Sequence, residues 1–285
     1  MAELLLGKPV VDHMTQDIVP RVQTLSARGI IPTLAIVRMG SNPDDLAYER
    51  SSTKRAGALG ISVRPYVLDV RARPQVVSAM IESINGDRTV DGCIVFRPLP
   101  PTVDEPTICN LLAPKKDVDG ITQSSLASVF SDGQAGFPPC TAAACIRMLD
   151  YYHIPIAGKR VVVVGRSLVV GKPTAMLFLR RDATVTICHS KTENLPEITR
   201  EADIVICATG QPRGFGAEYF REGQTVLDVG INFDEEGKSC GDVDFDEVEP
   251  IVGAISPVPR GIGAVTTSEI MEHVVTAAEI AAREP

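Results

Sequence analysis

The chain has 285 residues, of which 44% are hydrophobic and 22% are charged, and this composition is typical of a globular protein large enough for two domains. Its net charge of −8, with no basic stripe of interleaved aromatics, argues against a nucleic acid or an acidic membrane surface as partner. No apolar run approaches a membrane span, the N-terminus lacks the order of a signal peptide, and the seven cysteines lack metal-binding spacing. We therefore expect a cytoplasmic protein with no metal site.

The first half of the chain alternates between helical and extended patterns, which predicts an α/β unit. The expected elements are a helix over 7–28, a strand over 32–39, a helix over 46–59, a strand over 61–68, a helix over 74–85, a strand over 92–96 and a helix over 104–112. The polar loop at 114–120 is typical of a solvated turn, whereas an enclosed Asp119 would need a polar ligand as its partner. Because this half has no glycine-rich phosphate turn, we expect it to bind the substrate.

The second half is organised around a β-branched strand over 160–164 that runs into a glycine turn. Gly165 and Gly171 lead into an expected helix over 173–179, so backbone N–H groups and a helix N-terminus could hold a phosphate. Because the spacing is not G-x-G-x-x-G, an ordinary tight turn after a buried strand is an equal alternative. Further elements are expected as helices over 142–152 and 266–283, the latter capped by Thr266, Thr267 or Ser268, and as strands over 183–190, 202–210 and 225–232. This order predicts a Rossmann-like, doubly wound dinucleotide-binding domain.

The end of the second strand of this domain indicates which dinucleotide is bound. An NAD-binding sheet carries an acid there, whereas this chain has His189, Ser190 and Lys191. Arg166 in the glycine turn, together with Ser190 and Lys191, would suit a 2′-phosphate, so NADP is favoured over NAD. A solvated loop with incidental basic residues is the alternative.

Ten separated stretches, in one order over nearly the whole chain, resemble the methylenetetrahydrofolate dehydrogenase/methenyltetrahydrofolate cyclohydrolase family. They are Tyr48 with a basic helix behind it, Asp91–Pro100, Pro114–Gly120, Pro139–Thr141, Gly165–Pro173, Cys188–Thr192, Ala208–Pro212, Asp228–Asn232, Gly241–Val243 and Pro257–Pro259. The resemblance implies a folate-binding catalytic domain over 1–140 plus 266–285, an NAD(P)-binding Rossmann domain over 141–265, and a cleft between them. It also implies oxidation of 5,10-methylenetetrahydrofolate to 5,10-methenyltetrahydrofolate by NADP, and a homodimer that pairs through the nucleotide domains. Bifunctional members then hydrolyse the product to 10-formyltetrahydrofolate.

The resemblance also implies the site residues. In the catalytic site, Asp119 would bind the pterin ring and Tyr48 would pack beside the substrate, with Ser52 and Phe96 as neighbours. The expected substrate-binding residues are Tyr48, Lys54, Pro98, Leu99, Asp119, Pro257 and Gly261. The expected cofactor-binding residues are Gly165, Arg166, Ser167, Val170, Gly171, His189, Ser190, Thr209, Gly210, Gly230 and Ile231.

The departures from the family pattern affect one of its two reactions. The family has a lysine four residues after the tyrosine and a glutamine before Pro-Leu-Pro, where this chain has Ser52 and Phe96. Lys54 differs from residue 52 in direction by about 200° on a helix, so it should not reach the same point. A serine hydroxyl is a poor proton acceptor for hydrolysis, whereas hydride transfer depends mainly on positioning. We therefore expect a dehydrogenase whose cyclohydrolase activity is weak or absent.

Three alternatives stay open. In a bifunctional enzyme, Lys54 or Arg97 would supply the missing charge. In an enzyme with a different anionic or folate-like ligand, Phe96, Arg97 and Arg260 would reshape the site. A paralogue could also bind dinucleotide or folate without catalysing a reaction.

Overall fold

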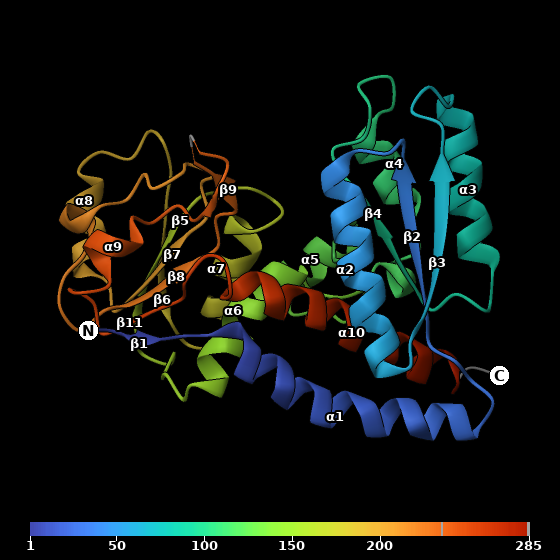
Figure 1. Cartoon of the computed structure of the whole chain (residues 1–285), viewed down its shortest axis with the longest axis horizontal. Helices are drawn as coiled ribbons and strands as arrows, with labels where there is room; N and C mark the ends of the chain where they lie inside the picture. The colour runs from blue at the N-terminus through green and yellow to red at the C-terminus, as the bar shows by residue number, and fades with distance from the viewer. Residues whose placement is uncertain (235, 284–285) are drawn as a thin grey trace. The chain divides into compact units, whose positions relative to one another are not determined.

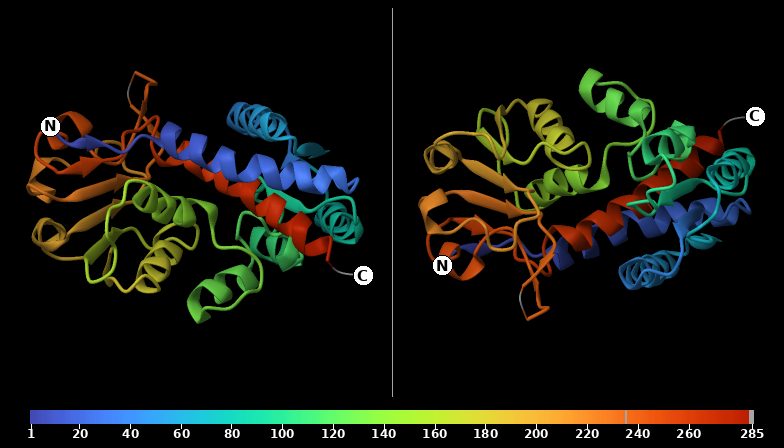
Figure 2. Two further views of the ribbon diagram at one scale, coloured as in Figure 1. Left: turned by 90° about the horizontal axis from the view of Figure 1, so that it is seen from below. Right: turned by 90° about the horizontal axis from the view of Figure 1, so that it is seen from above.

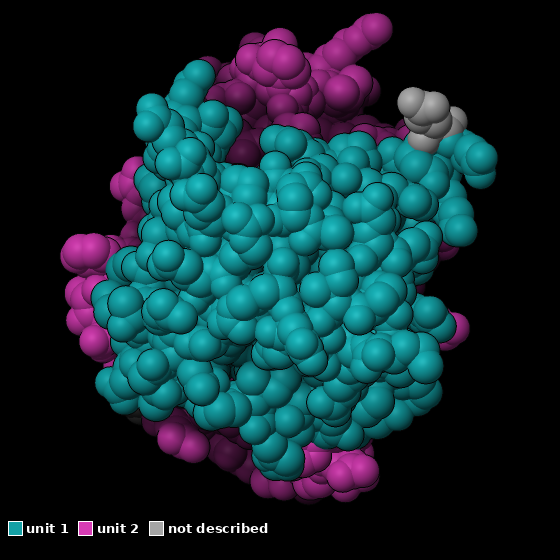
Figure 3. All heavy atoms as spheres, turned by 90° about the vertical axis from the view of Figure 1, so that its left-hand side faces the viewer, with its two compact units in different colours: residues 1–12, 141–266 teal, residues 13–140, 267–285 magenta. Residues whose placement is uncertain are grey.

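The structure, a computed structural model, describes residues 1–234 and 236–283, and the chain divides into two compact units. Unit 1 comprises residues 1–12 and 141–266, and unit 2 comprises residues 13–140 and the C-terminal stretch from Thr267 (Figure 3). The expected folate-binding domain included residues 1–12, which cluster with unit 1 in the structure. The reason is a short strand, β1 (Glu3–Leu4), which pairs in parallel with β11 (Ala254–Ile255) of the unit 1 sheet. Residues 284 and 285 of the expected domain lie outside the described residues.

Unit 2 is built on a three-stranded parallel sheet in the order β3-β2-β4 (Figure 1). Its strands are β2 (Thr33–Met39), β3 (Ser62–Leu68) and β4 (Gly92–Val95). The helices that lie wholly or mostly in this unit are α1 (Gly7–Ala27), α2 (Pro43–Leu59), α3 (Pro74–Gly86), α4 (Glu105–Leu111), α5 (Gln123–Ser131) and α10 (Ile262–Ala281). The central strand β2 is almost completely buried, which agrees with its unbroken apolar run.

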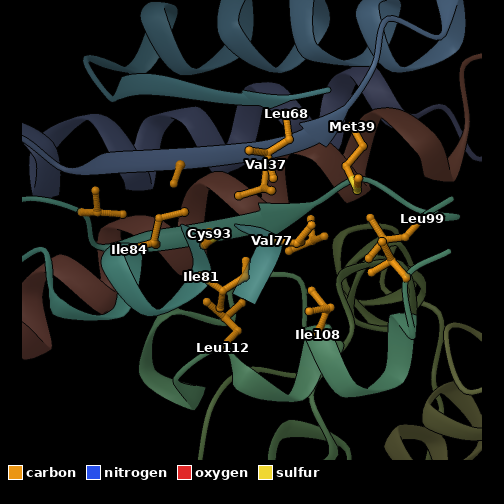
Figure 4. Close-up of a cluster of buried hydrophobic side chains, with 14 residues drawn as sticks. Val37, Met39, Leu68, Val77, Ile81, Ile84, Cys93, Leu99, Ile108 and Leu112 are labelled. Atoms are coloured by element: carbon orange, nitrogen blue, oxygen red, sulfur yellow. The ribbon is translucent and has the colours of Figure 1, made fainter. Parts of the chain in front are cut away.

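The core of unit 2 lies between the sheet and the helices α3 and α4 (Figure 4). Val37 and Cys93 from the strands meet Ile81 and Ile84 of α3 and Ile108 of α4, and all five are buried. The apolar residues of α3 recur at helical spacing, so one face of the helix enters the core, as its sequence predicts.

Helices α1 and α10 run side by side (Figure 2). Arg21 joins them, because its guanidinium donates hydrogen bonds to Thr276 Oγ1 at 2.7 Å and to both carboxylate oxygens of Glu279 at 2.9 Å. Pro20 lies inside α1 without ending the helix. Helix α10 begins at Ile262, before the expected start, so the prediction that residues 266–268 cap it was wrong.

A buried lysine closes the C-terminal end of α3. The ammonium of Lys116, in the short helix η1 (Pro114–Lys116), donates to the carbonyls of Ile84 at 2.5 Å and Asp87 at 2.6 Å. Burial lowers the pKa of Lys116, and the charges of Asp87 and Asp91 oppose that shift. Two carbonyl groups of the main chain thus depend on one side chain for a hydrogen-bond donor.

Replacing Lys116 by methionine is expected to lower the free energy of unfolding by about 2 kcal/mol, because the α3 carbonyls lose their buried donor. Urea denaturation measures this change. An Arg88→Met control, at an exposed position of the same unit, should stay within about 0.5 kcal/mol of the parent. Equal midpoints for Lys116→Met and the control would contradict the capping role.

Unit 1 contains a six-stranded sheet in the order β1-β11-β8-β7-β5-β6, and all its strand pairs are parallel. Its remaining strands and helices are β5 (Arg160–Val164), β6 (Thr184–Cys188), β7 (Ile204–Cys207), β8 (Thr225–Asp228), α6 (Cys140–Tyr151), α7 (Gly171–Leu179), α8 (Leu195–Glu201) and α9 (Phe245–Val248). A separate antiparallel pair joins β9 (Asn232–Phe233) to β10 (Ser239–Cys240). The parallel order confirms the predicted doubly wound α/β fold. None of the described helices is both long and apolar enough to cross a membrane.

Candidate active site

The glycine turn after β5 lies where the strand order of the sheet reverses. Strand β5 pairs with β6 on one side and with β7 on the other. Open parallel sheets bind ligands at this point, beyond the carboxyl ends of the strands. Gly165 has a φ of +135°, and a Cβ there would lie 2.3 Å from the Ala208 carbonyl oxygen. A Cβ on Gly171 would lie 2.2 Å from the Gly165 oxygen, so close backbone approach requires both glycines.

The loop between these glycines leaves polar groups open to a ligand. Ser167 Oγ accepts hydrogen bonds from the backbone N–H groups of Val170 at 3.1 Å and Gly171 at 3.4 Å, which holds the loop against the start of α7. Arg166 is exposed, and its guanidinium has no hydrogen bond to any described residue. A free guanidinium beside a helix N-terminus is suited to a phosphate group.

The turn after β6 lies at the same edge of the sheet as Arg166. The strand register pairs Val164 with Cys188, so Arg166 and Ser190 each follow a paired strand end by two residues. The His189 N–H donates to Thr192 Oγ1 at 2.9 Å, and the Lys191 N–H donates to His189 Nδ1 at 3.2 Å. Residues 189–191 therefore offer a hydroxyl and an ammonium, and the nearest carboxylate along this turn is that of Glu193. These residues fit a dinucleotide with a 2′-phosphate.

The buried carboxylate of Asp242 holds together the loops that follow β7 and β8. One oxygen accepts hydrogen bonds from the N–H groups of Thr209 and Gly210, and the other accepts from Gln211 N–H at 3.0 Å and Asn232 Nδ2 at 2.9 Å. Three expected cofactor residues thus lie around this carboxylate. Thr209 and Gly210 donate to it, and a Cβ on Gly230 would lie 2.1 Å from one of its oxygens. Ile231, the next expected residue, is 69% exposed.

A second buried carboxylate supports the first. Asp228 accepts hydrogen bonds from the N–H groups of Gly230 at 3.1 Å, Asp242 at 3.0 Å and Val243 at 2.9 Å. Burial raises the pKa of Asp228 to about 7, these N–H donors oppose the shift, and the charge of Asp242 adds to it. The two aspartates thus build the loop framework.

In unit 2, Tyr48 and Phe96 form an aromatic pair, with ring centroids 5.5 Å apart in an edge-to-face arrangement. Tyr48 is 38% exposed as a whole, but its hydroxyl end is enclosed. Burial raises the pKa of Tyr48 above its usual range, with smaller increases from Asp119 and Cys140. Ser52, one turn later on α2, is fully buried. Its hydroxyl lies near enough to that of Tyr48 to lower the tyrosine pKa slightly, yet it reaches hydrogen-bond geometry with no described residue.

Asp119 and Arg97 form a pair of opposite charges in the same unit. Asp119 Oδ2 lies 3.9 Å from Arg97 Nη2, and the two side chains are 28% and 24% exposed. Burial raises the pKa of Asp119 to about 6, although the charge of Arg97 opposes the rise and that of Asp117 adds to it. The loop at 114–120 is therefore more than a solvated turn, because it carries an enclosed carboxylate.

Comparison with known proteins decides the family. One family model, "Tetrahydrofolate dehydrogenase/cyclohydrolase, catalytic domain", matches residues 5–119, and a second, "Tetrahydrofolate dehydrogenase/cyclohydrolase, NAD(P)-binding domain", matches residues 139–282. The chain belongs to the tetrahydrofolate dehydrogenase/cyclohydrolase family. The resemblance inferred from the sequence is thus confirmed.

Relatives match this family member over almost its full length. It is 48% identical to the bifunctional protein FolD of Carboxydothermus hydrogenoformans, over 98% of both chains, and 46% identical to that of Clostridium botulinum, over 98% of this chain and 99% of the relative. The crystal structure of the bifunctional enzyme FolD of Campylobacter jejuni has a TM-score of 0.96 at 35% identity, and the match covers 98% of this chain and 99% of that chain. The Trypanosoma brucei enzyme, complexed with NADP cofactor and inhibitor, has a TM-score of 0.93 at 30% identity, covering 99% of each chain.

The other expected substrate residues of this tetrahydrofolate dehydrogenase/cyclohydrolase chain lie in different surroundings. Lys54 is exposed on α2, away from the buried face that carries Ser52, as the helical spacing predicts. Pro98 is exposed, whereas Leu99 is buried and its N–H donates to Glu105 Oε2 at 2.8 Å. The remaining two, Pro257 and Gly261, belong to unit 1. Their neighbour Arg260 lies in the same unit and has a φ of +87°, a backbone conformation that favours glycine.

Sequence reasoning missed the supporting carboxylates. The Gly-Asp-Val motif at 241–243 was a signal of family membership, but it gave no sign that Asp242 binds the loops after β7 and β8. Asp228 lay within the expected strand over 225–232 and had no assigned role. Arg97 was noted as a departure from the family, but its pairing with Asp119 needed the fold. A buried polar residue is recognised by the groups around it, which lie far away along the chain.

Proposed function

We propose that this chain is an NADP-dependent methylenetetrahydrofolate dehydrogenase. The observation that carries the proposal is the glycine turn of Gly165 and Gly171 at the reversal of the sheet, with Arg166 and Ser190 at one edge and no acid at positions 189–191. The NADP bound to the Trypanosoma brucei relative supports the same cofactor. The substrate is 5,10-methylenetetrahydrofolate, and the product is 5,10-methenyltetrahydrofolate.

Bound NADP supplies the hydride acceptor, and the residues of the chain supply binding and orientation. The start of α7 and Arg166 hold phosphate groups, and the Asp242 network keeps the Thr209–Gly210 loop in place. Asp119 accepts hydrogen bonds from the substrate, and the Tyr48–Phe96 pair packs against its ring. Loss of hydride from the one-carbon bridge requires no proton acceptor at that carbon. Orientation of two ligands is therefore sufficient for this reaction.

The chemistry of the same residues favours weak or absent cyclohydrolase activity. Attack of water on the methenyl cation needs a group that accepts a proton. The hydroxyl of Ser52 is neutral, Phe96 has no polar atom, and the guanidinium of Arg97 has N–H donors but no acceptor atom. Lys54 is exposed on another face of α2. None of these four side chains is therefore suited to take over the proton transfer.

The alternative is a bifunctional enzyme that also forms 10-formyltetrahydrofolate. It has a specific argument in its favour, because relatives at 48% and 46% identity over nearly the whole chain carry the name bifunctional protein FolD. In that case a water molecule would have to be activated without a basic side chain at position 52.

A paired assay of purified protein tests both proposals. The first measurement follows NADP-dependent oxidation of methylenetetrahydrofolate, and the second follows loss of methenyltetrahydrofolate absorbance without cofactor. We expect oxidation without accelerated hydrolysis. Hydrolysis that keeps pace with oxidation would establish the bifunctional alternative. Absence of both reactions would overturn the proposed activity and favour a non-catalytic binding protein.

Substituting Arg166 by alanine is expected to raise the KM for NADP by about 10- to 100-fold and to leave the KM for NAD nearly unchanged, because only NADP carries a 2′-phosphate. Steady-state kinetics with both cofactors measures the effect. A Lys238→Ala variant, which removes an exposed charge of the same unit, is the matched control. An equal change for both cofactors would mean that Arg166 contacts a phosphate they share.

Binding of folate is expected to depend on the ionisation of Asp119. The pKa of this carboxyl is about 6, set by burial, with Arg97 and Asp117 as its charged neighbours. Only the ionised form accepts two hydrogen bonds, so affinity should be level above this pKa and fall about tenfold for each unit below it. Fluorescence titration with folic acid across this range measures the profile. Asp119→Asn should bind weakly with a flat profile, and an unchanged profile in that variant would contradict the assignment.

We also propose that the protein forms a homodimer through its nucleotide-binding units. Strand β6 is the outermost strand of the unit 1 sheet, so one of its edges has no partner strand in the described sheet. Ile187 on this strand is 37% exposed. Unprotected edges of this kind pair readily with another chain. Sedimentation velocity should give twice the monomer mass, and a monomer at all concentrations would contradict the proposal.

A further inference from the structure

Asp119 and Arg97 leave their hydrogen-bonding capacity unused within the fold. Their closest atoms are 3.9 Å apart, which is an ion pair but too long for a hydrogen bond. Neither side chain forms a hydrogen bond with any other described residue. Charged groups with exposures of only 28% and 24% normally have hydrogen-bond partners. The pair therefore offers a ligand one carboxylate acceptor beside one guanidinium donor.

Other enclosed charges of unit 2 are satisfied by the chain itself. Asp117, two residues before Asp119, accepts hydrogen bonds from Thr122 N–H at 2.8 Å and Ser125 Oγ at 2.6 Å. The guanidinium of Arg38 donates to Glu49 Oε2 at 2.6 Å. The unit thus has the means to satisfy its charges internally, and Arg97 and Asp119 differ from these neighbours.

The surroundings of the pair are suited to a flat ring. Phe96 directly precedes Arg97 and packs edge-to-face against Tyr48. Tyr48 is close enough to Asp119 for that charge to raise the tyrosine pKa. A ring that packs against these aromatics would present one edge to the carboxylate and the guanidinium together. That edge must carry hydrogen-bond donors next to a carbonyl acceptor.

We propose that Arg97 is a specificity-determining residue, which donates hydrogen bonds to the 4-oxo group of the pterin ring while Asp119 accepts them from N3–H and the 2-amino group. The inference rests on the proposed function, since the pterin belongs to the proposed substrate. Its three polar groups follow one another along one edge of the ring, in the order donor, donor, acceptor. The guanidinium repels a 4-amino group, which offers a donor where the acceptor should be. Arg97 thus selects a ring edge that carries an oxo group over one that carries an amino group.

The experiment compares folic acid with 4-amino-4-deoxyfolic acid, in which an amino group replaces the 4-oxo group and N3 carries no hydrogen. Dissociation constants are measured by fluorescence titration of the full chain, at a pH well above the pKa of Asp119, for the parent and for Arg97→Leu and Arg97→Lys. The parent should prefer the 4-oxo compound by about 10- to 100-fold. Arg97→Leu should reduce this preference about tenfold, to the part that Asp119 gives through N3, and Arg97→Lys, with a single charged donor, should reduce it less. An Arg88→Leu control, at an exposed position of the same unit, should keep the full preference.

Dehydrogenase turnover, measured in parallel, separates this inference from the proposed function. Equal weakening of both ligands in Arg97→Leu, or no weakening, would overturn the role of Arg97 even if the enzyme is active. A preference that Arg97→Leu reduces, in a protein without turnover, would support the role of Arg97 and overturn the proposed activity. A parent protein that binds neither compound would overturn both. If Arg97→Leu does not fold, an undiminished preference in Arg97→Lys overturns the guanidinium contact, and a reduced one supports it.

Discussion

Replacing Ser52 by lysine together with Phe96 by glutamine is expected to raise the rate of methenyltetrahydrofolate hydrolysis by about 10²- to 10⁴-fold. Ser52 is fully buried one turn after Tyr48, so a lysine there would extend into an enclosed site. Burial lowers the pKa of a lysine towards neutrality, where it can exchange protons with water. Glutamine in place of Phe96 would offer an amide oxygen to orient the ammonium group. The double variant should therefore gain the second reaction while keeping the first.

Loss of methenyltetrahydrofolate absorbance without cofactor measures this gain. Ser51→Lys is the matched control, because it introduces the same charge at the exposed neighbouring position on α2. It should leave the rate at the parent level. A double variant that hydrolyses no faster than this control would mean that Ser52 and Phe96 do not limit the reaction.

Replacing Asp242 by alanine is expected to destabilise the protein by about 3 kcal/mol and to weaken NADP binding at least about tenfold. The substitution leaves the N–H groups of Thr209, Gly210 and Gln211 and the amide of Asn232 without their shared acceptor. The loops beyond β7 and β8 would then lose their fixed positions. Relief of repulsion between Asp242 and Asp228 offsets part of this cost.

Chemical denaturation and NADP titration measure the two effects. Asp242→Asn keeps one acceptor oxygen, so it should fall between the parent and the alanine variant. Asp246→Ala removes an exposed carboxylate from α9 and should change neither quantity. NADP affinity at the parent level in Asp242→Ala would show that this carboxylate supports the fold without positioning the cofactor loops.

Much of the fold could be predicted because burial leaves a local pattern. The run of valines in β5 predicts a strand covered on both faces, and the spacing of Val77, Ile81 and Ile84 predicts the buried face of α3. The glycine turn was also recognisable from the sequence, since the close backbone approach at Gly165 and Gly171 leaves no room for a Cβ. The predicted elements with strong periodicity are therefore present. Element ends were less predictable, as the early start of α10 illustrates.

The amino-acid sequence by itself determined the two α/β units, the family and the positions that depart from its pattern. Only the tertiary structure decided that β1 joins the unit 1 sheet by pairing Glu3 with Ala254, because a strand of two residues has no sequence pattern that indicates a distant partner. It also separated two aspartates that look alike in the Asp-x-Asp sequence. Asp117 is satisfied by Thr122 and Ser125, whereas Asp119 faces Arg97 and keeps its acceptors available. The function of a charged group depends on the partners around it, and chain folding alone brings those partners together.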